Sequence, residues 1–493
     1  MPNNLYRLNS ISLNNFWCYN NEPNMFEMGE SVTVIIGLNG AGKTAFLTAV
    51  KKAISFILSK DRRKEIRFIG DGKDVKDAGI AVRDVRFDES DGMYDYDYHY
   101  PVTLTCNGTI MGHDLLWYYE KPSKNIRVDK MLFRDALDRV LREYSNQPTQ
   151  TTLPLLAYFS DSYPHVRPAQ MKYEKDVLIE KGEKIERRTG YYHWDLSSSS
   201  FYFWRDLFVN SIKRYYHPVT GYEATLGKMQ RSDYSEDLND SFQKRLQNLI
   251  ATKTEIDYIG RYLKSFTKPF LTHDNEDLAI DDIVVSSYME NSKEVFTLEF
   301  LFADGHKTIF ERLPEGYKRL IAIAFEICYR FFILNKNVIV HEPDAEPKGI
   351  VLIDELELHL HPTLAQESLI RLTKTFPEVQ FIVSTHSPAI ISNLHNDGQQ
   401  NKIYRLNPDH SAEEIDDFFG AEYGDTLVMS MGSYGRLHEL EVLEELYREF
   451  YIAGDNEGKG KVADDLLHMF EPSTLSRRWQ AEIISKWEER LRR

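Results

Sequence analysis

The chain has 493 residues, of which 42% are hydrophobic, and a formal net charge of −16. This length and apolar content allow two or three folded units, and they exclude a fibrous or disordered protein. The acidic balance excludes broad electrostatic coating of nucleic acid, although a local basic patch is compatible with it. No apolar run approaches the roughly 18 residues of a membrane span, and the first residues lack a secretory signal, so we expect a cytoplasmic protein without a membrane segment.

The three cysteines, Cys18, Cys106 and Cys328, are widely spaced and form no Cys-x-x-Cys or Cys/His pattern. The sequence therefore supports neither a disulfide framework nor a structural zinc site. A reducing compartment fits this cysteine usage.

Apolar patterns predict the first elements around a glycine-rich segment. Residues 5–36 are typical of short strands and end in a β-branched run at 32–36. Residues 45–58 carry apolar side chains at helical spacing and contain no helix breaker. We therefore expect a strand, a glycine loop and a helix in succession.

The middle of the chain changes from strands to helices. Residues 78–120 alternate apolar and polar side chains, which indicates antiparallel strands, and residues 153–159 indicate a buried strand. Residues 200–268 have helical spacing. We expect an inserted helical lobe there.

The second half returns to alternating strands and helices. Residues 295–302 alternate and lead into a hairpin turn at 304–305. A helix, a strand, a helix and a strand then follow, over 313–334, 350–353, 364–375 and 380–383. Strands alternating with helices predict a parallel sheet.

The end of the chain is predicted to be helical. Helices over 437–450 and 479–491 are separated by the polar, glycine-containing residues 454–458. No heptad repeat is long enough for an extended coiled coil. The aromatic-rich helices either pack on the rest of the protein or form a docking surface.

Residues 37–44 fit the pattern G-x-x-x-x-G-K-[ST] of a phosphate-binding loop. Glycines let successive backbone N–H groups curve around phosphate oxygens at the positive end of a helix. Lys43 would place a charge on the β- and γ-phosphates, and the Thr44 hydroxyl would coordinate Mg²⁺. The predicted nucleotide-binding residues here are Gly37, Asn39, Gly40, Ala41, Gly42, Lys43, Thr44 and Ala45.

Two carboxylates follow the apolar run 350–353, where a parallel strand delivers side chains to the sheet edge. Asp354 would hold Mg²⁺, and Glu355 would polarise the attacking water as the catalytic base. Alone this pair is a weak signal, because a strand entering a solvated turn has the same pattern. Its position after a phosphate loop makes the functional interpretation strong.

His386 follows the strand at 380–383. Its ring would contact the γ-phosphate and report whether that phosphate is present. The alternative is a histidine with a purely structural role.

Together these segments resemble the RecF/SMC branch of the ABC ATPases. The similar motifs are the phosphate loop, the Asp354-Glu355 strand with its continuation to Pro362, and residues 384–388. The resemblance covers the two core halves and not the middle lobe. It implies an α/β ABC-type ATPase head with a mixed sheet, an inserted helical lobe and a helical C-terminal region, using ATP and Mg²⁺.

The family also carries a signature, beginning Leu-Ser-x-Gly, that covers the ATP of a second head. Residues 313–320 resemble it, which implies nucleotide contacts from Gly316, Tyr317 and Lys318 and a head-to-tail homodimer or higher oligomer. Pro314 replaces the serine, and Lys318 or Arg319 could compensate for it. The glycine and the helix N-terminus still suit anions.

Some family positions stay open. His361 stands where transporter relatives have an aspartate, and no Q-loop glutamine is identified among Gln147, Gln150 and Gln170. His359 and His361 could form a metal-binding pair, but they have no third ligand nearby in the sequence, and the family resemblance accounts for them. The basic run at 60–64 is either a solvated face or a nucleic-acid contact.

The predicted organisation has four parts. These are an N-terminal half of the ATPase head, an inserted lobe, a C-terminal half of the head and a helical partner-binding region, over 1–160, 161–290, 291–410 and 411–493.

The layout, with Leu-Pro-Glu-Gly-Tyr-Lys-Arg in the signature, is most similar to the PtuA family of Septu and retron-linked antiphage systems. The resemblance implies an HNH nuclease partner of the PtuB kind that the ATPase controls. Nucleic-acid partners, retron DNA or RNA or phage DNA, are compatible with it.

Two alternatives remain, a RecF-like DNA-repair clamp ATPase and a self-contained OLD-like nuclease. The second needs acids at converging strand ends. The pairs 416–417 and 464–465 do not offer this arrangement, since the second opens a helical-looking tail.

Overall fold

The computed structural model describes residues 6–21, 24–58, 79–89, 96–126, 151–161, 187–195, 201–213, 215–216, 221–229, 236–268, 279–290, 293–431, 438–468 and 474–492. It contains two compact units, Met1–Gly420 and Ala421–Arg493. The basic run at 60–64 and the glutamines Gln147, Gln150 and Gln170 lie outside the described residues.

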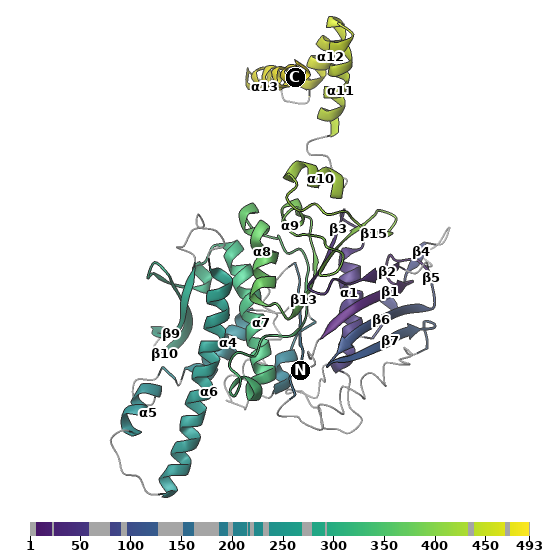
Figure 1. The fold of residues 1–493 in the computed structure, drawn as a ribbon. Coiled ribbons are helices and arrows are strands. Elements are labelled where there is room, and N and C mark those ends of the chain that lie inside the picture. Colours follow the sequence, from purple (N-terminus) through teal and green to yellow (C-terminus); the bar gives the residue numbers. More distant parts are fainter. Residues whose placement is uncertain are drawn as a thin grey trace. The chain divides into compact units, whose positions relative to one another are not determined.

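A six-stranded sheet forms the centre of the first unit (Figure 1). Its strands, in spatial order, are β15 (Ala412–Glu414), β14 (Asn401–Leu406), β3 (Val32–Gly37), β13 (Val379–Ser384), β12 (Gly349–Ile353) and β8 (Leu155–Phe159). All neighbours are parallel except β14 and β15. Every residue of β3, β8, β12 and β13 is buried, which explains why these strands are mainly apolar. The predicted α/β fold with a mixed sheet is confirmed.

A second, antiparallel sheet has the order β2-β1-β6-β7. Its strands are β1 (Arg7–Asn14), β2 (Asn24–Glu27), β6 (Val102–Ile110) and β7 (His113–Lys121). Helix α1 (Lys43–Ile54) contacts both sheets, and the short 3-10 helix η1 (Ser55–Leu58) continues it. Trp117 of β7 is buried and donates from Nε1 to the carbonyl oxygen of Ala53, at 2.9 Å. The antiparallel strands expected between 78 and 120 are therefore present, with a small hairpin of β4 (Phe87–Glu89) and β5 (Tyr96–Tyr98) and a 3-10 turn, η2 (Val82–Asp84).

Helices lie on the side of the central sheet away from the antiparallel sheet of β1, β6 and β7 (Figure 1). They are α4 (Phe201–Ile212), α5 (Tyr222–Met229), α6 (Glu236–Thr267), α7 (Glu315–Ile339), α8 (Pro362–Thr375) and the short α9 (Pro388–Ile391), with 3-10 turns η4 (Arg187–Tyr191) and η6 (Phe310–Arg312). A three-stranded antiparallel sheet accompanies them, β9 (Ile280–Glu290), β10 (Lys293–Phe302) and β11 (Lys307–Ile309). The helical segment predicted over 200–268 is confirmed.

Helix α7 extends beyond its predicted end at 334. The backbone leaves the helical region at Asn335, where φ is −129° and ψ is 21°. The buried Asn335 amide accepts from the N–H of Leu153 at 2.7 Å and donates to the Leu153 carbonyl at 3.0 Å. The same amide donates to the carbonyl of Phe331 at 3.2 Å, four residues earlier in α7, so this carbonyl has a partner at the kink.

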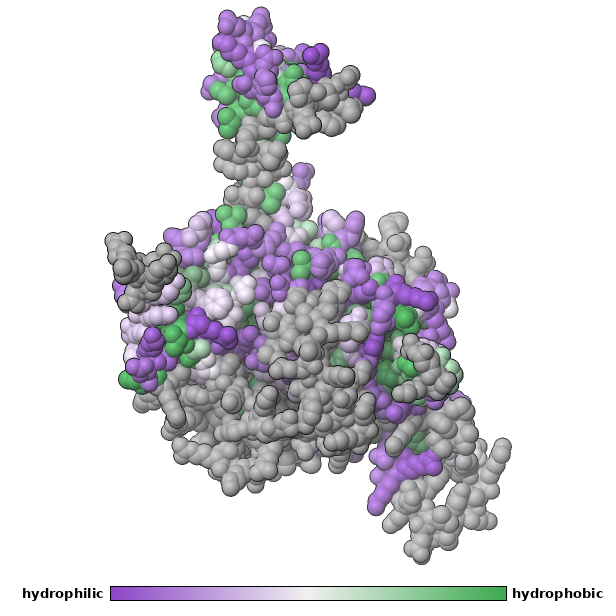
Figure 2. Space-filling model, turned by 180° about the vertical axis from the view of Figure 1, so that it is seen from behind, coloured by the Kyte–Doolittle hydropathy of each residue, from purple (hydrophilic) through white to green (hydrophobic). Residues whose placement is uncertain are grey.

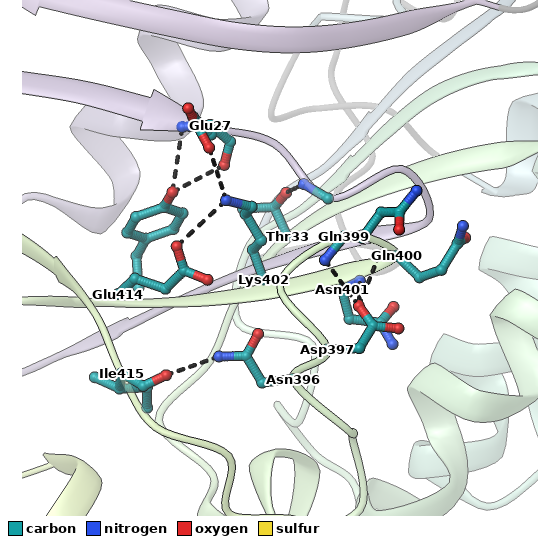
Figure 3. A network of polar contacts seen from close by, with 12 residues as sticks. Glu27, Thr33, Asn396, Asp397, Gln399, Gln400, Asn401, Lys402, Glu414 and Ile415 are labelled. Atoms are coloured by element: carbon teal, nitrogen blue, oxygen red, sulfur yellow. Dashed lines mark hydrogen bonds and ion pairs between the residues drawn. The ribbon is translucent and has the colours of Figure 1, made fainter.

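Polar side chains join segments that are far apart in the sequence. Gln380 of β13 is buried, accepts from the N–H of Leu8 and donates to its carbonyl, which ties β13 to β1. Lys402 of β14 binds Glu27 of β2 at 2.9 Å and Glu414 of β15 at 3.3 Å (Figure 3). These contacts join strands β13 and β14 of the central sheet to strands β1 and β2 of the antiparallel sheet.

The second unit is a small helical body. It consists of α10 (Tyr423–Met431), α11 (His438–Ile452), α12 (Asn456–His468) and α13 (Thr474–Arg492). Its core is made by five buried residues, Leu443, Tyr447, Val462, Leu466 and Trp487.

Helix α12 was not predicted from the sequence. Asp455 starts this helix inside the predicted break, because its side chain accepts from the N–H groups of Glu457 and Gly458, at 2.9 and 3.0 Å. We expected Asp464 and Asp465 to open a helix, and this prediction is wrong. Both residues lie within α12, which begins at Asn456.

On the face seen in Figure 2, the coloured surface is mainly hydrophilic and its hydrophobic residues form small separate patches. Within the described ranges, no helix is both long enough and apolar enough to cross a membrane.

Candidate active site

The phosphate-loop pattern lies between β3 and α1, as the sequence predicts. Positive φ angles of 148°, 83° and 104° at Gly37, Gly40 and Gly42 curve the backbone in a way that other residues rarely adopt. A side chain at Gly40 would meet nothing within 4 Å. Residues 38–40 are exposed, whereas Ala41 and Ala45 are buried. The outer side of the loop is therefore open to a ligand.

The Lys43 ammonium is folded back onto this loop. It donates to the carbonyl oxygens of Gly37 and Leu38, at 2.9 and 3.0 Å. Burial lowers the pKa of Lys43, and the nearby charges of Asp354 and Glu355 oppose that shift. The cation of the loop and the carboxylates after β12 thus share one site.

Thr44 and Asp354 meet across 310 positions of sequence. The Thr44 hydroxyl donates to Oδ2 of Asp354 at 3.1 Å. The other carboxylate oxygen accepts from Ser384 Oγ at 2.5 Å. A hydroxyl and a carboxylate are the oxygen donors that Mg²⁺ prefers, so this pair fits the cation expected with ATP.

Glu355 lies beside this pair, with its backbone at a φ of 49°. Its N–H donates to Ser384 Oγ at 2.9 Å, so one hydroxyl orients both Asp354 and Glu355. Burial raises the pKa of the Glu355 carboxyl, and the charges of Asp354 and Glu357 raise it further. A carboxylate with a raised pKa is suited to accept a proton from water.

His386 is half-buried at the same sheet edge. Burial lowers its pKa, and the charge of Lys43 lowers it further, while Glu357 acts in the opposite direction. The N–H of Thr385, the residue before His386, donates to the carbonyl of Ile35 in β3, the strand that leads into the phosphate loop, at 3.1 Å.

Arg319 is fully buried beneath this edge. Its guanidinium donates to the carbonyl oxygens of Asp354, Glu355, Ser160 and Asp161, at 2.9, 3.1, 3.3 and 3.2 Å. Arg319 therefore joins α7 to the ends of β12 and β8. The sequence suggested that Arg319 could compensate for the serine missing at position 314. Because its guanidinium binds these four carbonyl oxygens, Arg319 is not available for that role.

The predicted signature residues lie in the first turn of α7. A Cβ on the buried Gly316 would be 3.1 Å from the carbonyl oxygen of His359, so α7 begins against the segment that follows Glu355. Lys318 pairs with Glu315 at 2.6 Å, and Tyr317 is half-exposed. Gly316 thus packs against the backbone of His359, four residues after Glu355.

The alternative of a metal-binding pair at His359 and His361 can be compared with the structure. His361 is the N-cap of α8, where its Nδ1 accepts from the N–H of Thr363 at 3.4 Å. Among the residues that the structure describes, no group of three or more histidine, cysteine, aspartate or glutamate side chains could hold a metal ion.

Sequence reasoning missed several residues around the loop. The Tyr19 hydroxyl donates to the carbonyl oxygen of Gly42 at 3.2 Å, and a Cβ on Gly42 would be 2.7 Å from Cys18 Sγ. Ser384 and Thr385 bind the carboxylates after β12. The Ser-Thr-His-Ser-Pro motif at residues 384–388 pointed to Ser384 and Thr385, but it did not predict which carboxylates they bind.

Comparisons with known proteins place these residues in a family. A model described as an AAA domain matches residues 10–266, and one described as an AAA ATPase domain matches residues 212–391. The SMC head domain from Thermotoga maritima is 11% identical, with a TM-score of 0.39 over 83% of this chain and 98% of that one. RecF bound to ATP is 12% identical, with a TM-score of 0.36 over 83% and 99%.

Three relatives carry names. The retron Vc95 probable ATPase of Vibrio cholerae is 25% identical over 74% of this chain and 67% of its own length, and the retron Ec83 probable ATPase of Escherichia coli is 24% identical over 78% and 69%. The Septu protein PtuA of Bacillus mycoides is 30% identical over 30% of this chain and 20% of its own. The chain therefore belongs to the AAA domain family, and it is similar to the retron ATPases and to PtuA.

Proposed function

We propose that this chain binds ATP with Mg²⁺ and hydrolyses it to ADP and phosphate between two copies of its head. The observation that carries the proposal is the 3.1 Å contact between the Thr44 hydroxyl and the Asp354 carboxylate. It joins the phosphate loop to the acidic end of β12. Glu355 and His386 follow the adjacent parallel strands β12 and β13, which supports their assignment to one site.

Each residue then has a chemical task. Lys43 exchanges the carbonyls of its own loop for phosphate oxygens, since an ammonium satisfied only by carbonyls gains from an anion. Thr44 and Asp354 would hold Mg²⁺, which supplies charge neutralisation on the phosphates. Glu355 orients and deprotonates the attacking water, and the His386 imidazole contacts the γ-phosphate.

A second head is expected to complete the site. The start of α7 and the segment 355–361 touch through Gly316 and the carbonyl of His359, so both elements can approach a partner together. The α7 N-terminus favours an anion there even with proline in place of serine. In this arrangement the nucleotide contacts of Gly316, Tyr317 and Lys318 are made to the partner's ATP.

The biological role that we propose is antiphage defence in the cytoplasm. Support comes from the names of the relatives, two retron ATPases and the Septu protein PtuA. We propose that ATP binding and turnover control a separate HNH nuclease of the PtuB kind. Nucleic acid, from a retron or a phage, would then be the target of that complex.

The test compares the purified chain with its complex with the HNH protein, on DNA and RNA, with and without ATP. Cleavage only by the complex, and its loss in the complex made with Lys43→Ala, supports control of a partner nuclease. Cleavage by the chain alone indicates a self-contained nuclease. DNA-stimulated ATPase activity without cleavage by either sample favours a repair clamp.

We propose that the C-terminal region 411–493 binds the partner, and most of it lies in the second unit, Ala421–Arg493. Val442 and Leu446 on α11 are 42% and 38% exposed, and Ile452 at its end is 73% exposed, although α11 also contributes to the core of the unit. Deleting residues 440–493 should leave ATP binding intact and abolish co-purification of the nuclease. Unchanged co-purification would place the interface elsewhere.

A further inference from the structure

One carboxylate binds two consecutive residues at the end of β13. Oε2 of Glu357 accepts from the Thr385 hydroxyl at 2.6 Å, and Oε1 accepts from the N–H of His386 at 2.5 Å. Hydrogen bonds to an ionised acceptor are about twice as strong as neutral ones. Glu357 therefore holds the backbone that carries the His386 ring.

The segment around Glu357 is itself tightly folded. The N–H groups of Leu358 and Leu360 donate to the carbonyls of Glu355 and Glu357, at 3.0 and 2.8 Å. Glu355 and His359 have positive φ angles of 49° and 65°, which non-glycine residues adopt only at tight turns. This fixed backbone directs the Glu357 side chain back to β13.

Thr385 completes the connection on the other side. It is fully buried, its N–H donates to the carbonyl of Ile35 in β3 at 3.1 Å, and its hydroxyl accepts from the N–H of Ser387 at 2.9 Å. With that lone pair occupied, the hydroxyl proton is free to point at Glu357. The contact thus links the segment 355–361 to the strand that leads into the phosphate loop.

We propose that Glu357 is the positioning residue that couples the segment 355–361 to the γ-phosphate contact of His386. This rests on the proposed function, because it takes His386 as the group that distinguishes ATP from ADP. The carbonyl of His359 lies against Gly316 at the start of α7. A partner head that moves this segment would therefore move the backbone of His386 through Glu357.

The charge of Glu357 and its hydrogen bonds can be separated. Glu357→Ala removes both bonds and the charge. Glu357→Gln removes the charge and keeps a carbonyl oxygen for the N–H of His386, so it should rescue part of the function. Thr385→Val removes only the hydroxyl contact.

The experiment measures equilibrium binding of ATP and ADP, with Mg²⁺, to the full chain. We expect Glu357→Ala to lower the preference for ATP over ADP about tenfold, which corresponds to the loss of one charge-assisted hydrogen bond from His386 to the γ-phosphate. The affinity for ADP should be unchanged. Glu357→Gln and Thr385→Val should lie between it and the wild type. Glu367→Gln is the matched control, since that carboxylate pairs with Arg371 on α8 and should leave the preference unchanged.

A double-mutant cycle separates positioning from general damage. In a His386→Ala background, Glu357→Ala should cause no further loss of the ATP preference, because both changes act through one imidazole. Additive losses, or a full preference in both Glu357→Ala and Thr385→Val, would overturn the proposal. Thermal melting of each variant checks folding.

The wild-type protein tests the proposed function separately from the positioning role of Glu357. A wild-type chain that prefers ATP but does not hydrolyse it contradicts the proposed turnover and leaves the positioning test valid. A wild-type chain that binds ATP and ADP equally overturns the sensing role of His386 and the inference with it.

Discussion

Nη2 of Arg319 lies 2.9 Å from the carbonyl oxygen of Asp354. The same guanidinium reaches the carbonyl of Glu355, so a cation on α7 holds the backbone of both the proposed Mg²⁺ ligand and the proposed catalytic base. Because α7 begins at the proposed signature, four residues before Arg319, this contact connects the surface that would meet a second head to the site of hydrolysis.

Arg319→Lys is expected to lower both stability and ATP turnover. A lysine cannot reach four carbonyl oxygens, so buried acceptors lose their partners at a cost of about 2–4 kcal/mol. The unfolding midpoint and the turnover rate measure the two effects. Arg371→Lys is the control, because Arg371 also donates to two backbone carbonyls, those of Phe266 and Lys268. Arg371→Lys should lower the unfolding midpoint but leave the turnover rate per folded molecule unchanged.

Thr44→Val is expected to raise the Mg²⁺ concentration for half-maximal turnover about tenfold or more. The change removes one oxygen donor, a loss of roughly 1.5–3 kcal/mol, while the shape of the side chain is kept. Thr44→Ser should retain most of the wild-type Mg²⁺ dependence. Thr48→Val, one turn further along α1, is the matched control. An unchanged Mg²⁺ titration for Thr44→Val would contradict the assignment of this hydroxyl.

Glu355→Gln is expected to bind ATP normally and to hydrolyse it about 10²–10⁴-fold more slowly, since an amide cannot accept the proton of the attacking water. Because the nucleotide then persists, the ATP-bound dimer should accumulate. Light scattering after size exclusion, with ATP or ADP present, measures this. Wild-type turnover in this variant would remove Glu355 as the catalytic base.

The pKa of His386 predicts a pH dependence of stability. Burial, and then Lys43, lower this pKa below the ordinary value near 6.5. Between the two values the unfolded chain binds a proton that the folded chain does not, so stability falls as pH drops below about 6.5. His386→Gln should lose this component. Unfolding midpoints of the first unit at pH 7.5, 6.5 and 5.5 test it, and parallel profiles for the two proteins would argue against a lowered pKa.

The sequence predicted best those elements whose pattern is local. The apolar runs of β3, β12 and β13 are continuous because both faces of each strand are buried, and the glycine loop follows directly from its spacing. Neither β14 nor α12 was predicted. Lys402 interrupts β14 with a charge that two glutamates neutralise, and α12 begins in a glycine-containing segment that Asp455 caps.

The roles of Ser384, Glu357 and Arg319 could not be predicted for a different reason. Each acts through a residue distant in sequence, at separations of 30, 29 and 35 positions for the contacts described. No local spacing encodes such a contact. The phosphate loop and the carboxylates after β12 were proposed from motifs, and their function stays a prediction that the variants above test.

The strand order has a consequence for the time at which this protein can begin to work. Strand β3 lies between β13 and β14, which end at residues 384 and 406. At about 5–20 residues per second, roughly 20–70 seconds separate the synthesis of Lys43 from that of the last strand beside it. Until residue 384 the buried strand β3 lacks both of these neighbours, and until residue 406 it still lacks β14; a chain in this state exposes apolar surface that chaperones bind. A ribosome that stops before β13 is complete releases a chain that has the whole phosphate-loop sequence but neither of the two strands beside β3, so we expect nucleotide binding only after translation has passed this point.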